Sequence, residues 1–220
     1  MNRSFVDKKR FGQWAIVTGS SSGIGAELAT QLAASGLDVV LVARRLDKLE
    51  ALGRALASEH GVQYRTVQAD LSQPGFFEAI TAVTDALDIG LFVGNAGFAN
   101  PGELWTIKRS ELFRAVHLKV NANLELVHHF APRLVTRGRG GILLTSSVGG
   151  LNGVPYVSNT AAIEAYVLTL GEGLHRELKP HGVYVSVLMP GPTLTESMAK
   201  MGVDPSKICL LYTSPSPRDS

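Results

Sequence analysis

The chain has 220 residues, a mass of 23.5 kDa and 45% apolar residues, which is typical of one globular domain and excludes a generally disordered protein. Its 21 Lys and Arg residues nearly balance its 19 Asp and Glu residues, giving a net charge of +2 with no long run of one sign. This balance argues against a nucleic-acid-binding protein, because such proteins concentrate basic side chains on one face. Cys209 is the only cysteine, which excludes an internal disulfide and a C-x-x-C metal site, so we expect no bound metal.

Apolar runs are short throughout the chain. None approaches the roughly 18 residues that mark a membrane span. The N-terminal residues 1–11 are polar and basic, and no apolar segment like that of a signal peptide follows them. We therefore expect a cytoplasmic protein without a membrane partner.

Six apolar runs alternate with segments of helical periodicity. The runs, in which we predict strands, cover residues 14–17, 39–42, 62–67, 91–93, 142–144 and 183–188. The helical segments run from Ile24 to a break at Gly36, and over 46–56, 75–86, 110–135 and 159–179. Repeated β–α–β units make neighbouring strands parallel and place helices on both faces of the sheet. The sequence therefore predicts a single α/β domain with a doubly wound Rossmann-type parallel sheet.

A glycine-rich loop joins the first predicted strand to the first predicted helix. Residues 18–25 read T-G-S-S-S-G-I-G, a G-x-x-x-G-x-G spacing that differs from the general G-x-G-x-x-G fingerprint of dinucleotide-binding proteins. Glycines there allow a tight turn and a close approach of the backbone to a pyrophosphate, and the helix N-terminus supplies amide donors. An ordinary turn is the alternative, but the position after a strand and before a helix favours a nucleotide site.

Five motifs, in the expected order, resemble those of the short-chain dehydrogenase/reductase family. The loop at 18–25 matches the family's Thr-Gly-x-x-x-Gly-x-Gly motif, and 94–97 (G-N-A-G) resembles its Asn-Asn-Ala-Gly motif with Gly in the first place. Asp70-Leu71 resembles the pair that contacts adenine, and Pro190-Gly191 resembles the turn beside the nicotinamide. Asn121 corresponds to a structural and catalytic Asn of the family. The resemblance extends from Gly12 to Met198.

This resemblance implies a nicotinamide cofactor, a small-molecule carbonyl or alcohol substrate, and a homo-oligomeric parent protein. It also implies that six of the family's seven strands are present. The residues that it assigns to the cofactor, together with two arginines discussed next, are Gly19, Ser21, Ser22, Gly23, Ile24, Gly25, Arg44, Arg45, Asp70, Leu71, Asn95, Ala96, Gly97, Pro190, Gly191, Thr193 and Thr195.

The residues after the second predicted strand bear on the choice between NADP(H) and NAD(H). A carboxylate at this place would bind the ribose 2′-hydroxyl of NAD and repel a 2′-phosphate. The chain instead has Arg44 and Arg45, whose guanidinium groups suit a phosphate dianion through bidentate, charge-assisted hydrogen bonds. A solvated basic pair at a helix start is the alternative interpretation. We predict that NADP(H) is preferred over NAD(H).

The family's chemistry uses a Ser, a Tyr thirteen residues later and a Lys four residues after the Tyr. Ser147 ends the fifth predicted strand, and counting from it places Thr160 at the Tyr position and Glu164 at the Lys position. Pro155 agrees with this register, since a Pro commonly precedes the family's Tyr by five residues. The resemblance therefore implies a catalytic set of Ser147, Asn121, Thr160 and Glu164.

These two replacements weaken the expected chemistry. A threonine hydroxyl is far less acidic than a phenol of pKa about 10, and Glu164 reverses the charge that would stabilise an alkoxide. Tyr156 fails the spacing from both Ser and Lys, and Glu164 as a substitute acid would need burial to raise its pKa. We expect an oxidoreductase with weakened activity; the alternatives are a non-catalytic NADP-binding protein and a non-functional gene fragment.

The last twelve residues differ in character from the rest. Residues 209–220 can be encoded by DNA that resembles a transposase adapter used in sequencing libraries, so we interpret them as a non-native tail. A natural disordered tail rich in Ser and Pro is the alternative. On this interpretation the NAD(P)-binding domain covers 1–208 and is incomplete at its C-terminus.

Overall fold

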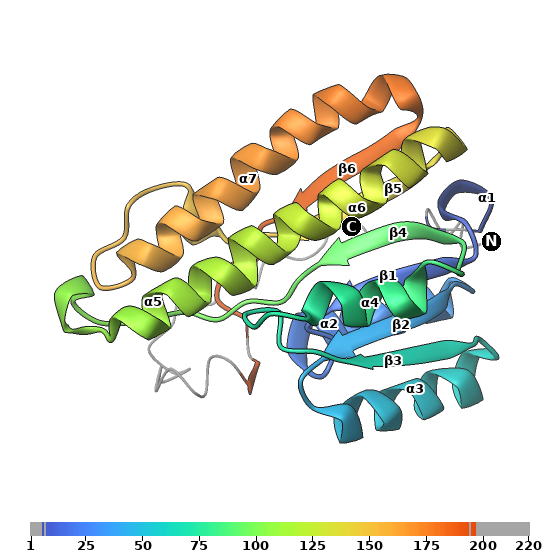
Figure 1. Ribbon diagram of the computed structural model, residues 1–220, viewed down its shortest axis with the longest axis horizontal. Helices are drawn as coiled ribbons and strands as arrows, with labels where there is room; N and C mark the ends of the chain where they lie inside the picture. The colour runs from blue at the N-terminus through green and yellow to red at the C-terminus, as the bar shows by residue number, and fades with distance from the viewer. Residues whose placement is uncertain (1–5, 7, 194, 197–220) are drawn as a thin grey trace, which may run out of the picture.

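The computed structural model describes residues 6, 8–193, 195 and 196, and shows one parallel sheet of six strands in the order β3-β2-β1-β4-β5-β6 (Figure 1). The order reverses between β1 and β4, as in other doubly wound sheets, and the carboxyl ends of the strands share one edge. The predicted single-domain Rossmann-type fold is thereby confirmed. The strands are β1 Trp14–Thr18, β2 Asp38–Ala43, β3 Tyr64–Gln68, β4 Ile89–Gly94, β5 Gly140–Thr145 and β6 Val183–Leu188.

Helices cover the two faces of the sheet unequally. Helices α2 (Gly23–Ala34) and α3 (Leu46–His60) pack with Val17 and Val39 on one face. Helices α4 (Phe76–Thr84), α6 (Ala122–Arg137) and α7 (Ser158–Leu178) pack with Phe92 and other side chains of the opposite face. The remaining elements are α1 Lys8–Phe11, η1 Leu104–Thr106, α5 Arg109–Val116, η2 His117–Asn121, η3 Val148–Gly150 and η4 Lys179–His181.

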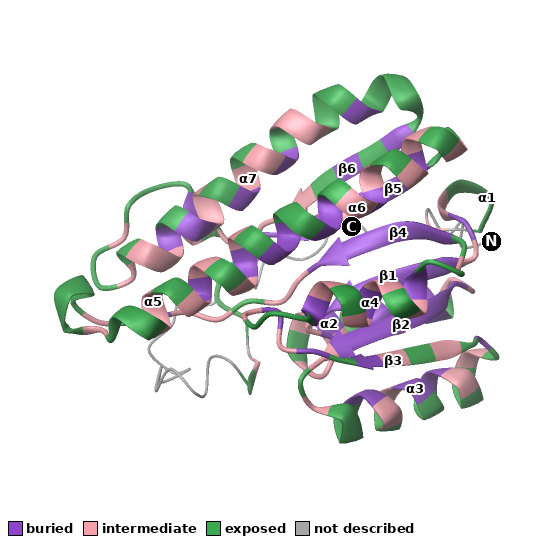
Figure 2. Ribbon diagram, in the orientation of Figure 1, coloured by how far each residue is buried: buried purple, intermediate pink, exposed green. Residues whose placement is uncertain are grey.

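The central strands β1 and β4 are apolar along almost their whole length, without the alternation of a half-exposed strand. Every residue of β1 and β4 is buried, because helices cover both faces of the middle of the sheet. In β6, at the edge of the described sheet, Val183 and Val185 are buried while Tyr184 is 50% exposed (Figure 2). The apolar runs therefore place β1 and β4 in a fully packed layer, whereas the edge strands β3 and β6 are only partly buried.

A π-helical turn divides the helix that the sequence predicts over 110–135. Helix α5 ends at Val116, residues His117–Asn121 form the π-helical η2, and α6 continues from Ala122. Such a turn carries one extra residue, so it shifts which side chains face inward relative to an ideal 3.6-residue repeat. Its effect here is to bury Lys119 and to leave Asn121 exposed.

Two of the sequence predictions concern the ends of the chain and its relation to membranes. Within the described residues, no helix combines the length and the apolarity that crossing a bilayer requires. The predicted non-native tail at 209–220 lies outside the described residues, so the tail and the domain boundary at 208 stay predictions.

Candidate active site

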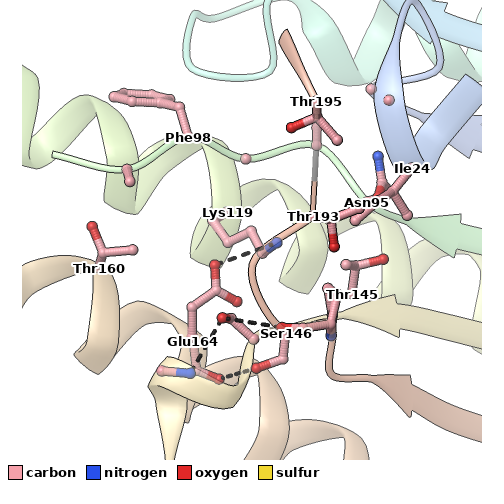
Figure 3. A pocket seen from close by; sticks show the side chains of 18 of the residues that line it. Ile24, Asn95, Phe98, Lys119, Thr145, Ser146, Thr160, Glu164, Thr193 and Thr195 are labelled. Atoms are coloured by element: carbon pink, nitrogen blue, oxygen red, sulfur yellow. Dashed lines mark hydrogen bonds and ion pairs between the residues drawn. The ribbon is translucent and has the colours of Figure 1, made fainter. Parts of the chain in front are cut away.

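A cavity of about 570 Å³ opens at the carboxyl edge of the sheet, where β1, β4, β5 and β6 end (Figure 3). It brings together most of the site residues that the sequence predicts: Gly19, Ser22, Gly23, Ile24, Asn95, Ala96, Gly97, Ser147, Thr160, Glu164, Pro190, Gly191, Thr193 and Thr195. Ser21, Gly25, Arg44, Arg45, Asp70 and Leu71 support or flank it without lining it, and Asn121 does neither. Further lining residues are Phe98, Ala99, Lys119, Thr145, Ser146, Val148, Gly149 and Pro192.

The glycine loop forms the wall of the cavity next to α2. Gly19 has a φ of +70°, a conformation that L side chains rarely adopt. A Cβ at Gly25 would overlap the carbonyl oxygen of Gly19, so the loop closes this tightly only with glycine there. Helix α2 begins at Gly23, and Gly23 and Ile24 of its first turn line the cavity. The first amides of a helix have no acceptor within it. The Ser20 hydroxyl is buried without a hydrogen-bond partner among the described residues.

The end of β4 is attached to the glycine loop through Thr18. The Thr18 hydroxyl accepts hydrogen bonds from the amides of Asn95 (2.9 Å) and Ala96 (3.2 Å). The Asn95 side-chain amide in turn donates to the Thr18 carbonyl at 3.2 Å. These contacts hold in place the part of the wall that residues 94–97 form. Gly94 has no side chain, which leaves room for Asn123, because a Cβ at position 94 would overlap Asn123 Oδ1.

Arg45 lies directly behind the glycine loop. Its Nη2 donates to the hydroxyls of Ser22 (2.9 Å) and Ser21 (3.1 Å). Its Nη1 lies 2.7 Å from a carboxylate oxygen of Glu196, whose other oxygen is 3.5 Å from Lys48 Nζ. The hydrogen bond from Arg45 and the two positive charges hold the pKa of Glu196 below its ordinary value. The Glu196 carboxylate therefore pairs with the Arg45 guanidinium, the same group that we expect to bind the 2′-phosphate of NADP(H).

Arg44 is the more available arginine, since its side chain is 61% exposed. Its Nη1 lies 3.9 Å from Asp70 Oδ2, at the end of β3. Burial alone would raise the pKa of Asp70, but hydrogen bonds from Ser72 and the charges of Arg44 and Arg114 hold it below the ordinary value. Leu71 is buried beside it in the core. The end of β2 thus presents a largely exposed guanidinium that is paired with the Asp70 carboxylate.

Ser147 and Thr160 face the cavity from the loop after β5 and from the first turn of α7. The Ser147 hydroxyl accepts a hydrogen bond from the Gly149 amide (3.2 Å) and lies 3.5 Å from the Pro190 carbonyl. The Thr160 hydroxyl accepts one from the Asn100 amide at 3.2 Å, so it ties the loop after β4 to α7. Thr145, buried below them, has a hydroxyl without a partner among the described residues.

Glu164 lies one turn after Thr160 and is paired with a residue that sequence reasoning missed. Its Oε1 is 3.6 Å from Lys119 Nζ, and the two side chains are only 12% and 6% exposed (Figure 3). Burial raises the pKa of Glu164 and lowers the pKa of Lys119, and each partner's charge opposes part of that effect. The second carboxylate oxygen, Oε2, is buried with no hydrogen-bond partner among the described residues.

Asn121 does not reach this group. It is exposed, and its side-chain amide lies 3.3 Å from His117 Nδ1, one turn back. Lys119 takes the inward position because of the π-helical turn, and the helical periodicity of the sequence contains no signal for that turn. A Lys between Leu118 and Val120 was the available hint, since it interrupts an apolar run, but surface lysines do so as well.

The comparisons with known proteins agree with this arrangement. The family profile described as "short chain dehydrogenase" matches residues 13–205. The chain belongs to the short-chain dehydrogenase family. The match covers every strand and the whole cavity lining, so the motif resemblance in the sequence is confirmed.

Individual family members are similar over most of this chain. A 7beta-hydroxysteroid dehydrogenase from Collinsella aerofaciens is 30% identical over 191 residues, 87% of this chain and 73% of the relative. A very-long-chain 3-oxoacyl-CoA reductase from Rattus norvegicus is 31% identical over 193 residues, 86% of this chain but 62% of the relative. A short-chain dehydrogenase from Sphingobium yanoikuyae, solved in complex with NADPH, superposes with a TM-score of 0.84 at 37% identity, covering 89% of this chain and 77% of that one.

Proposed function

We propose that this short-chain dehydrogenase binds NADP(H) at the carboxyl edge of the sheet and transfers hydride between it and a small carbonyl or alcohol substrate, at a reduced rate. The observation that carries the proposal is the cavity at the strand-order reversal, lined by the glycine loop, by 95–97 and by 190–193. The relatives named above are a hydroxysteroid dehydrogenase and an oxoacyl reductase, which supports the oxidoreductase class and leaves the particular substrate open.

The residues at the glycine loop fit a dinucleotide. Ser22, Gly23 and Ile24, at the start of α2, line the cavity, and the first amides of a helix have no acceptor within it, as a pyrophosphate site requires. The absence of a Cβ at Gly25 keeps the loop backbone close to that site. From there the adenine half would extend toward Asp70, and the nicotinamide half toward Asn95 and Thr193. When bound, the nicotinamide would supply or accept the hydride.

The preference for NADP(H) rests on the arginines after β2. Arg44 and Arg45 leave no carboxylate at the strand end to bind a ribose 2′-hydroxyl, and a 2′-phosphate would gain two guanidinium partners. The Glu196 carboxylate is paired with Arg45, so a 2′-phosphate would have to compete with Glu196 for the Arg45 guanidinium.

The reduced rate follows from the residues around the substrate position. Ser147 can donate a hydrogen bond to a substrate oxygen, but Thr160 is a poor acid and its oxygen is already engaged by the Asn100 amide. Glu164 places a carboxyl group, not a cation, one turn away. Loss of a matched acid–base group costs about 10²–10⁴-fold in rate.

A second candidate function is NADP(H) binding without turnover. The pairing of Glu164 with Lys119 favours it, because that pair occupies the wall of the cavity where the family has its acid–base partners. Both candidates share the cofactor site, and only turnover separates them.

Titration calorimetry with NADPH and NADH on the full chain and on Arg44→Ala/Arg45→Ala tests the cofactor site. Each charge-assisted hydrogen bond is worth about 1.5–3 kcal/mol, so the variant should lose NADPH affinity by roughly tenfold or more while its NADH affinity changes little. Equal weakening for both cofactors would contradict the phosphate assignment. A full chain that binds neither cofactor would overturn the proposed function itself.

A further inference from the structure

The cavity wall holds an ion pair that the proposed function does not use. Among the described residues that line the cavity, only Lys119 and Glu164 carry an ionisable side chain. All other lining residues are glycines, apolar residues, hydroxyl residues or Asn95. Among the described lining residues, the groups able to give a proton to a substrate oxygen near neutral pH are therefore these two.

Lys119 is held in place from three sides. The π-helical η2 turns it inward, Glu164 on α7 lies 3.6 Å from its Nζ, and Gly97 packs on its end. A Cβ at Gly97 would lie 3.1 Å from Lys119 Nζ, so the end of the lysine side chain packs closely against this glycine. Figure 3 shows the amine extending between the carboxylate of Glu164 and the loop that carries Thr193.

Fold stability gives little reason for such a pair. Taking an ammonium and a carboxylate out of water costs several kcal/mol per ion, on the order of what their attraction returns, and apolar residues of similar volume do as well or better. One carboxylate oxygen, Glu164 Oε2, remains unpartnered among the described residues. A buried, incompletely satisfied pair inside a cleft is typical of a working site.

We propose that Lys119 is the proton donor to the substrate oxygen during carbonyl reduction, and that Glu164 is the partner that restores its proton. This inference rests on the proposed function, because it needs a hydride source in the same cavity. It assigns a catalytic role to a residue that the family motifs do not mark in this sequence.

When bound, the nicotinamide would supply a hydride, with two electrons, to the carbonyl carbon, and the π pair of the C=O bond would move onto oxygen. A Lys119 N–H bond then breaks and an O–H bond forms, leaving the electron pair on Nζ as a neutral amine. The Glu164 carboxyl group passes a proton from water to that amine. The carbonyl is reduced to an alcohol, and the nicotinamide is oxidised.

The environment suits this role. An acid works best when its pKa lies near the operating pH, and burial lowers the pKa of Lys119 from that of a solvated lysine. Ser147 faces the same cavity and can orient the substrate oxygen by donating to it. Thr160 remains as a structural link to Asn100.

The test compares Lys119→Met with the matched control Lys108→Met, which removes an exposed lysine outside the cavity. NADPH affinity is measured by fluorescence, and NADPH oxidation is followed with diacetyl, an activated diketone. We expect Lys119→Met to bind NADPH within about threefold of the parent and to lose about 100-fold or more in turnover. Lys108→Met should change neither quantity.

Two more variants separate proton donation from charge and from folding. Lys119→Arg keeps the positive charge but cannot release a proton near neutral pH, so it should be as inactive as Lys119→Met. Lys119→Met/Glu164→Leu removes both charges and leaves no buried carboxylate alone, so it should fold and remain inactive. Full turnover in either variant would overturn the inference.

A readout without turnover completes the test. In NMR of isotope-labelled lysine, the signal absent from Lys119→Met should titrate below the ordinary lysine pKa of about 10.4. A Lys119 signal that titrates at or above the ordinary lysine pKa would contradict the role. If the parent binds NADPH but reduces no diacetyl, both the reductase proposal and this inference are refuted. If the parent reduces diacetyl and Lys119→Met reduces it at the same rate, only this inference is refuted.

Discussion

The two halves of the sheet relate differently to the family to which the chain belongs. In the half that contains β1, β2 and β3, the glycine loop and the end of β4 keep the family's motifs, and the backbone geometry explains each glycine. In the half that contains β5, β6 and α7, the strands and the cavity are equally regular, but the register that we predict from Ser147 puts Thr160 and Glu164 where the family has a phenol and a cation. The two halves therefore differ in their motifs while sharing one regular scaffold.

The same backbone shape can therefore carry different side chains at the cavity wall. Glu164 keeps its place on α7 because Lys119 from η2 partners it and the Ser146 hydroxyl donates to its main-chain carbonyl at 2.8 Å. Substituting position 164 alone would leave Lys119 buried without an opposite charge. The pair must change together.

This coupling gives the largest expected effect. Thr160→Tyr/Glu164→Lys alone places a second ammonium against Lys119, and leaving a buried charge unpaired costs roughly 3–5 kcal/mol. Adding Lys119→Asn removes the conflict, so the triple variant should fold and raise diacetyl reduction by about 10²-fold or more over the parent. Thermal unfolding and NADPH oxidation measure the two outcomes.

The order of stabilities is the control for that prediction. The double variant should unfold at a lower temperature than both the parent and the triple variant. A double variant as stable as the parent would show that Lys119 and position 164 are not coupled. A triple variant that folds, binds NADPH and reduces no diacetyl would show that the register from Ser147 is wrong.

The fold was largely predictable from the sequence, whereas the site was predictable only in part. Buried strands such as 14–17 and 39–42 carry their own signal, because continuous apolar runs between helical segments have few other interpretations. The cleft followed from the glycine loop and its position. Lys119 was missed and Asn121 was chosen instead, since a π-helical turn changes the inward face without any change in composition.

In the half of the sheet that contains β1, β2 and β3, a substitution in the glycine loop should weaken NADPH binding. Gly25→Ala puts a methyl group against the Gly19 carbonyl, so the loop must open and its amides must move. We expect NADPH affinity to fall by about tenfold or more, since overpacking a tight contact costs typically 1–3 kcal/mol. Calorimetry measures the change.

Gly173→Ala provides the matched control for Gly25→Ala. Gly173 lies in α7, where an added Cβ meets nothing within 4 Å. This substitution should leave NADPH affinity unchanged and raise stability slightly, because alanine favours a helix over glycine. Equal affinities for NADPH in the two variants would mean that the glycine loop is not the pyrophosphate site.

The smallest expected effect concerns Glu196, whose carboxylate pairs with Arg45 and Lys48 in the same half. The carboxylate is 41% exposed, so solvent screens the pair and its loss alters binding only modestly. Glu196→Gln frees the Arg45 guanidinium for a phosphate, and NADPH affinity should rise by about threefold while NADH affinity stays the same. Glu125→Gln, an exposed substitution on α6 outside the cavity lining, is the control and should change neither affinity. The two cofactors differ only in the 2′-phosphate, so a gain in affinity for both would mean that Glu196 competes with the pyrophosphate instead. A loss of NADPH affinity would mean that Glu196 positions Arg45 for binding.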